Sequence, residues 1–102
     1  MFARALIVTV LLIGCAGTSI DSHDYPRTCA NDGDCALVYS GDLCAYCQCP
    51  NSGIATSALP RYTADADARK GGCPKNTPPV DCAPCTSQVP FCLGGACSAH
   101  AQ

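Results

Sequence analysis

Cysteine is the residue type with which this chain could do the most chemistry, because eleven of its 102 residues are cysteines. Thiols can pair as disulfides, bind a metal ion as thiolates, exchange disulfides with a substrate, or carry a covalent modification. Ten of them occur between Cys29 and Cys97, whereas Cys15 stands apart, directly behind an apolar run. Since an odd number cannot pair completely, Cys15 requires its own explanation.

The ten later cysteines are predicted to form five disulfides. They are Cys29, Cys35, Cys44, Cys47, Cys49, Cys73, Cys82, Cys85, Cys92 and Cys97. The chain between them has few large apolar side chains, so burial cannot offset the ordering of about 70 residues at about 1.5 kcal/mol each. An exported chain this short meets an oxidising compartment, where disulfides supply the missing stability. The spacing does not select a pairing, although one intervening residue disfavours Cys47–Cys49.

Two pairs of the Cys-x2-Cys type also permit a zinc interpretation. Cys44 with Cys47, and Cys82 with Cys85, could together supply four thiolates to one tetrahedral ion. This interpretation leaves six other cysteines without partners in an oxidising compartment, so we expect no metal site.

Cys82-Ala83-Pro84-Cys85 is similar to the Cys-x-Pro-Cys motif of thioredoxin-like proteins. In that family the first cysteine begins a helix, whose N-terminus stabilises the thiolate. Pro90 lies five residues after the second cysteine and prevents a long helix here. We therefore expect both cysteines to be structural.

A short apolar segment opens the chain. The nine residues Ala5–Ile13 contain one polar residue, Thr9, and follow a single positive charge at Arg4. A membrane-spanning helix needs roughly 20 apolar residues, whereas this length suits the hydrophobic region of an export signal. Residues 1–14 are therefore predicted to be a signal peptide.

Leu12-Ile13-Gly14-Cys15 resembles the lipobox of bacterial lipoproteins, in which aliphatic and small residues precede the modified cysteine. The resemblance implies that diacylglycerol is attached to the Cys15 thiol, that a dedicated signal peptidase cuts before it, and that the new amino group is acylated. An ordinary secretory signal cut after Ala16 would instead discard Cys15. If Cys15 carries lipid, the remaining ten cysteines are an even number.

The same resemblance implies a lipid-anchored protein of the bacterial cell envelope, whose partner is the lipid bilayer. Two or three acyl chains on Cys15 give a long-lived attachment, because each buried CH₂ adds about 0.8 kcal/mol. Ala16 follows the cysteine where enteric lipoproteins retained at the inner membrane have Asp. This difference implies the outer membrane, with the domain facing the periplasm or the cell surface.

The charge of the exported part argues against nucleic acid as a partner. Residues 15–102 carry five basic side chains against eight aspartates, with no glutamate, and so have a formal side-chain charge of −3. No basic patch for phosphate contacts is evident in the sequence. Because Asp favours turns over helix interiors, the acidity also indicates many loops.

Turn residues precede the first predicted strand of the domain. Asn31, Asp32 and Asp34 could bind calcium, but the segment lacks the alternating ligands and the distal Glu of an EF-hand loop. We predict a turn there instead. The residues that follow, 35–39, are rich in β-branched and aromatic side chains and predict a short strand.

One helix is predicted near residues 58–70. Its narrow apolar stripe, at i, i+3 and i+7, consists of Leu59, Tyr62 and Ala66. Asp65 and Arg69 are spaced for an i, i+4 ion pair, and Arg69 and Lys70 suit the negative end of the helix.

The segment "VPFCLGGACSA", residues 89–99, predicts a hairpin that turns at its two glycines. With a two-residue turn, Leu93 faces Ala96 and Cys92 faces Cys97. The distance between facing cysteines permits a disulfide without requiring one.

These elements predict a small disulfide-rich α+β fold with short strands and hairpins, one helix and many loops. Residues 15–28 are small and polar and are predicted to be the lipidated N-terminus and a flexible tether. Residues 29–98 are predicted to be the disulfide-stapled domain, and residues 99–102 a tail. His23 and His100 are then solvated residues outside this domain.

The sequence predicts no enzyme and no cofactor, because no Ser/His/Asp set, carboxylate pair or phosphate loop can be assembled from it. We expect a non-catalytic binding or structural module of the envelope that contacts an envelope or extracellular protein or peptide. The stretches "DGDCALVY", "CAYCQCP" and "CLGGAC" are similar to small cysteine-rich lipoproteins of environmental bacteria, most of unassigned function.

The alternative is a small serine-proteinase inhibitor. Residues 85–92, "CTSQVPFC", resemble the reactive loop of Bowman–Birk inhibitors, Cys-Thr-x-Ser-x-Pro-Pro-x-Cys. The resemblance gives Ser87 the specificity position after Thr86, and a rigid loop would lose little entropy on binding a protease. This loop is one residue shorter than the family's, and Phe91 stands where the second proline belongs.

Overall fold

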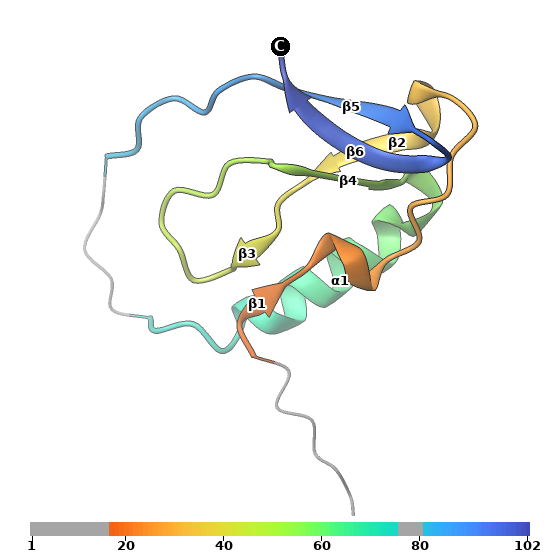
Figure 1. Cartoon of the computed structure of the whole chain (residues 1–102). Helices are drawn as coiled ribbons and strands as arrows, with labels where there is room; N and C mark the ends of the chain where they lie inside the picture. Colours follow the sequence, from red (N-terminus) through yellow and green to blue (C-terminus); the bar gives the residue numbers. More distant parts are fainter. Residues whose placement is uncertain (1–16, 76–80) are drawn as a thin grey trace, which may run out of the picture.

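The computed structural model describes residues 17–75 and 81–102. Within them the chain forms three pairs of short antiparallel strands and one α-helix (Figure 1). The elements are β1 (Ser19–Ile20), η1 (Ser22–Asp24), η2 (Asp32–Asp34), β2 (Cys35–Val38), β3 (Gly41–Asp42), β4 (Ser52–Ala55), η3 (Thr56–Ala58), α1 (Leu59–Lys70), β5 (Gln88–Leu93) and β6 (Ala96–Ala101). With five disulfides, they confirm the predicted small disulfide-rich α+β fold.

β5 and β6 form the predicted hairpin, in which Cys92 faces Cys97. Gly94 and Gly95 have φ angles of 58° and 83°, the left-handed conformation that this two-residue turn needs and that glycine adopts without strain. The prediction of a tail over residues 99–102 is wrong. β6 runs nearly to the end of the chain, because β5 is long enough to supply partners for its backbone groups.

The β5–β6 hairpin packs against the β2–β4 pair (Figure 1). A Cβ atom at Gly53 of β4 would lie 2.5 Å from the carbonyl oxygen of Ser98 in β6. Glycine at this position therefore lets the two backbones approach closely. The disulfide between Cys35 and Cys97 connects β2 to β6 covalently at the same contact.

A single buried cluster joins α1, the β2–β4 pair and the N-terminal segment. Its members are Ile20, Tyr25, Val38, Leu43, Ile54, Ala58 and Ala66. The apolar stripe of the helix is confirmed, because Leu59 and Tyr62 pack against this cluster beside Ala66. The helix begins at Leu59, with Pro60 in its first turn, where proline's missing N–H costs nothing.

The segment predicted to be a flexible tether is part of the domain from Thr18 onward. β1 pairs with β3, and Ile20 and Tyr25 are 3% and 4% exposed. Backbone groups farther along the segment bond to β4 and β6. The tether prediction for residues 15–28 is therefore wrong for residues 18–28, because two large apolar side chains bind this polar segment to the core. Its first two residues lie outside the described part of the chain.

A second region, called here the stapled lobe, consists of residues 44–50, 73–75 and 81–87. It lies to one side of the packed part, at the left in Figure 1. Three disulfides join its segments: Cys44–Cys73, Cys47–Cys82 and Cys49–Cys85. All residues from Asp81 to Ser87 are exposed, and none of the lobe's described residues is buried. Covalent bonds therefore hold this region in place of a core.

Candidate functional site

All ten cysteines predicted to form disulfides do so. The pairs are Cys29–Cys92, Cys35–Cys97, Cys44–Cys73, Cys47–Cys82 and Cys49–Cys85. Their Cα–Cα distances, from 5.3 to 5.9 Å, lie in the usual range for disulfides. Each pair joins residues at least 29 positions apart in sequence, so all five constrain long loops of the unfolded chain. Cys15 lies outside the described residues.

The cysteines that suggested a zinc site or redox chemistry are all in disulfides. None of them offers a thiolate in this state. Cys47 bonds to Cys82, and Cys85 bonds to Cys49. The two cysteines of the Cys-x-Pro-Cys motif are therefore bonded to different partners. In this oxidised state, each of these sulfurs serves to crosslink the chain.

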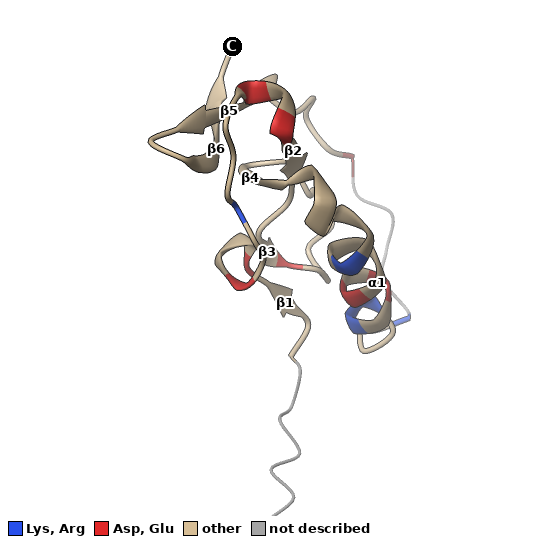
Figure 2. Cartoon of the chain, turned by 90° about the vertical axis from the view of Figure 1, so that its right-hand side faces the viewer, with Lys and Arg blue, Asp and Glu red and all other residues tan. Residues whose placement is uncertain are grey.

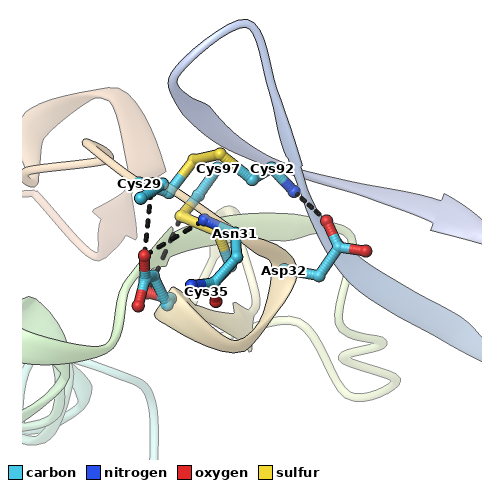
Figure 3. Close-up of a disulfide and its surroundings, with 8 residues drawn as sticks. Cys29, Asn31, Asp32, Cys35, Cys92 and Cys97 are labelled. Carbon is cyan, nitrogen blue, oxygen red and sulfur yellow. Dashed lines mark hydrogen bonds between the residues drawn. A yellow bond between two sulfur atoms is a disulfide. The ribbon is translucent and has the colours of Figure 1, made fainter.

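Two disulfides lie side by side at the start of β2 (Figure 3). The Sγ atoms of Cys29, Cys35 and Cys97 are within 4.8 Å of one another. Because all three sulfurs are in disulfides, the group offers no thiolate to a metal ion. Its effect is to fasten β2 and the turn before it to the β5–β6 hairpin.

The predicted turn forms between Cys29 and Cys35, and its carboxylates accept backbone hydrogen bonds, one within the turn and one from β5. Asp34 Oδ2 accepts hydrogen bonds from the N–H groups of Ala30 and Asn31 at 2.8 and 3.2 Å. Asp32 Oδ1 accepts from the N–H of Cys92 at 2.8 Å (Figure 3). The second contact occupies an outward-facing N–H on the edge of β5, which limits strand addition there.

Residues 85–92 do not form a loop closed by its own disulfide. Cys85 bonds to Cys49, and Cys92 bonds to Cys29. From Gln88 onward the segment is strand β5, and its backbone pairs with β6. This geometry does not favour the proteinase-inhibitor alternative.

The two histidines belong to structured elements, although both are exposed. His23 Nδ1 lies 2.9 Å from Asp21 Oδ1, which also accepts the His23 backbone N–H. The hydrogen bond from that N–H lowers the pKa of Asp21. The His100 ring lies edge-on to the ring of Phe91, with centroids 4.6 Å apart. The prediction that both residues lie outside the domain is therefore wrong.

Tyr25 attaches the N-terminal segment to α1. Its hydroxyl donates to Asp65 Oδ2 at 2.7 Å, and the guanidinium carbon of Arg61 lies 5.1 Å from its ring centroid. Burial, together with the hydrogen bond to Asp65, raises the pKa of Tyr25 to about 12.

The predicted pairing of Asp65 with Arg69 is wrong, because Arg69 Nη1 instead donates to the carbonyl of Ser19 at 3.1 Å.

The N-terminal end of the described chain, called here the exit, is fixed at Thr18. Its carbonyl accepts from the N–H of Leu43 at 2.7 Å, and its Oγ1 donates to Asp42 Oδ1 at 3.3 Å. A Cβ atom at Gly72, just beyond α1, would lie 3.4 Å from Thr18 Cγ2. The exit therefore lies between β3 and the C-terminal end of α1.

Sequence reasoning assigned Arg69 and Lys70 to the end of a helix and missed that this helix end lies beside the exit. Their position depends on the packing of β1 beside α1, which joins segments about 50 residues apart. No local pattern in the sequence encodes that contact. The one available signal was the pair of large apolar residues, Ile20 and Tyr25, in an otherwise polar segment.

Comparisons with protein-family models, with characterised proteins and with solved structures find no match for this chain. Within residues 17–75 and 81–102, no helix combines the length and the apolar character needed to cross a bilayer. The features that bear on function are the disulfide pairing and the exit at Thr18, three positions beyond Cys15.

Proposed function

We propose that this protein is an exported bacterial lipoprotein, held in the cell envelope by acylated Cys15, whose domain is a non-catalytic binding or structural module. One observation supports this proposal above the others. Five disulfides account for every cysteine except Cys15, and Cys15 completes the sequence that resembles a lipobox. An even set in the domain leaves that thiol available for lipid.

The disulfides also support export from the cytoplasm. Five crosslinks in a chain of this size form and persist in an oxidising compartment, such as the bacterial periplasm or the cell surface. The apolar segment Ala5–Ile13 fits the signal that would deliver the chain there. Ala16, following the acylated residue, favours the outer membrane as the destination.

A non-catalytic role is supported by how the domain uses its polar groups. The carboxylates of Asp32 and Asp34 accept backbone hydrogen bonds, and that of Asp65 accepts the hydroxyl of Tyr25. These groups stabilise turns and packing contacts. The proposed activity is therefore binding or envelope structure, with an envelope or extracellular protein or peptide as the partner.

The test is the intact mass of the full chain, produced in a bacterium and extracted from its membranes without reduction. We expect a chain that begins at Cys15, carries diacylglycerol and an amide-linked acyl group, and lacks the ten hydrogens lost in five disulfides. A Cys15→Ala variant, matched in every other residue, should carry no lipid. A water-soluble product that begins after Cys15 would contradict the proposal.

A further inference from the structure

The distance between the acylated residue and the folded domain is short. Two residues, Ala16 and Gly17, separate Cys15 from Thr18, and the three extended steps from one to the other reach at most about 11 Å. Thr18 is itself hydrogen-bonded to β3. Lipid on Cys15 therefore brings one particular end of the domain against the bilayer, and a long tether that would let the domain turn freely is absent from the described residues.

Basic residues gather at that end. Of the five basic residues after Cys15, three lie at or just beyond the C-terminal end of α1: Arg69, Lys70 and Lys75. Arg69 is joined to the exit by its hydrogen bond to the Ser19 carbonyl. Figure 2 shows blue segments at the lower end of α1, at the same end of the molecule as β1.

The acidic residues near the exit make this surface asymmetric. Asp42 is engaged by the Thr18 hydroxyl and by the N–H of Cys44, while Asp67 lies on α1. Asp21 caps η1 and accepts the backbone N–H of His23, and Asp24 belongs to η1, which follows β1. The end of α1 therefore carries three basic residues beside Asp67, an excess of positive charge that would turn this side toward a negatively charged surface.

We propose that, in the acylated protein, the C-terminal end of α1 rests on the headgroups of an anionic phospholipid bilayer through Arg69, Lys70 and Lys75. This inference rests on the proposed function, because acylation of Cys15 is what brings the surface to the membrane. Long basic side chains near a bilayer are attracted to anionic headgroups, and that attraction weakens with salt. The domain is then held in one orientation.

This orientation determines what the domain presents to partners. The β5–β6 hairpin lies at the end of the molecule opposite β1 in both views, with its turn at one side (Figures 1 and 2). Leu93, at that turn, is 65% exposed. The membrane-distal end is therefore the hairpin, which is rigidly joined to β2 by two disulfides.

The chain offers a direct test, because Lys70 and Lys75 are its two lysines. The acylated full chain, with Leu93→Lys added as a distal reporter amine, is reconstituted into phosphatidylcholine vesicles with and without phosphatidylglycerol. Brief acetylation followed by peptide mass analysis gives the rate at each amine. We expect phosphatidylglycerol to slow acetylation of Lys70 and Lys75 about threefold or more. The amine at position 93 should be unaffected, and high salt should remove the protection.

A charge variant sharpens the test. Lys75→Gln should weaken the protection of Lys70, whereas Arg27→Gln, an equal loss of charge beside β6, should leave it unchanged. If the intact mass shows acylation but all amines react at equal rates on both vesicles, the orientation is overturned and the lipid anchor stands. An intact mass without acyl groups overturns both.

Discussion

Two disulfides of the packed part, Cys29–Cys92 and Cys35–Cys97, lie beside a buried apolar core, and Cys35 and Cys97 are themselves buried. The three disulfides of the stapled lobe instead join segments in which no described side chain is buried. The same covalent bond therefore acts in two different surroundings.

The contrast shows what each crosslink can contribute. In the packed part, apolar contacts order the native chain, so a disulfide restricts mainly the unfolded state and adds to stability. In the stapled lobe, the native chain is itself ordered by the crosslinks. Removing one there frees the native chain as well as the unfolded one, so the free energy of global unfolding changes less.

The largest effect is expected from Ile54→Ala in β4. Ile54 is fully buried, at 0% exposed, and losing its side chain should lower the free energy of unfolding by about 2–5 kcal/mol. Urea unfolding without reductant measures the change. Leu93→Ala, at an exposed hairpin position, is the control and should cost about 0.5 kcal/mol or less. If both variants lowered the free energy of unfolding equally, a buried core in the packed part would be contradicted.

The next largest effect is expected from removing the Cys35–Cys97 disulfide with the paired change Cys35→Ala and Cys97→Ala. The bond closes a separation of 62 residues between β2 and β6, and its loss should lower the free energy of unfolding by about 2–4 kcal/mol. The same urea titration measures it. A change below about 1 kcal/mol would contradict a stabilising role for this crosslink in the packed part.

A smaller effect is expected from Tyr25→Phe, which removes the hydrogen bond to Asp65 and should cost about 1 kcal/mol. The raised pKa of Tyr25, about 12 against 10.0, also predicts a pH dependence. Above pH 10 the Tyr25 hydroxyl loses its proton in the unfolded chain before it does so in the folded one. The free energy of unfolding should therefore fall as pH rises from 10 to 12. The melting temperature, measured across this pH range, should fall less in the Tyr25→Phe variant than in the unchanged protein. Part should remain, because burial also raises the pKa of Tyr62. An identical fall in both proteins would show that the Tyr25 hydroxyl does not cause the loss of stability.

The smallest effect on global stability is expected from Cys47→Ala with Cys82→Ala in the stapled lobe. The free energy of unfolding should change by about 1 kcal/mol or less, because the packed part keeps its core and both of its disulfides. Trypsin cleavage after Lys75, within the lobe, should become several-fold faster, as followed by mass. A global loss equal to that of the Cys35/Cys97 variant would show that the two regions do not differ.

Features that depend on local sequence could be predicted. The Gly94-Gly95 turn fixes the hairpin register, since φ above zero is needed at both positions. The stripe of Leu59, Tyr62 and Ala66 identifies the helix and its buried side. In both cases the physical cause lies within a few neighbouring residues.

Features that depend on distant contacts could not be predicted. The polar composition of residues 15–28 suggested a tether, yet Ile20 and Tyr25 find partners in β3 and α1 that lie far along the chain. The disulfide pairing is decided by the same tertiary packing, because spacing does not choose among the possible pairings. The basic surface at the exit follows from that packing as well.

The central claim is that Cys15 carries lipid while the other ten cysteines are bonded to one another. Its most direct test is tryptic mapping of the membrane-extracted protein, alkylated without reduction. The account predicts that the peptide spanning residues 15–27 carries acyl groups on Cys15 and that no cysteine in the chain is alkylated. An alkylated Cys15, a disulfide between Cys15 and a domain cysteine, or several alkylated cysteines in the domain would contradict it.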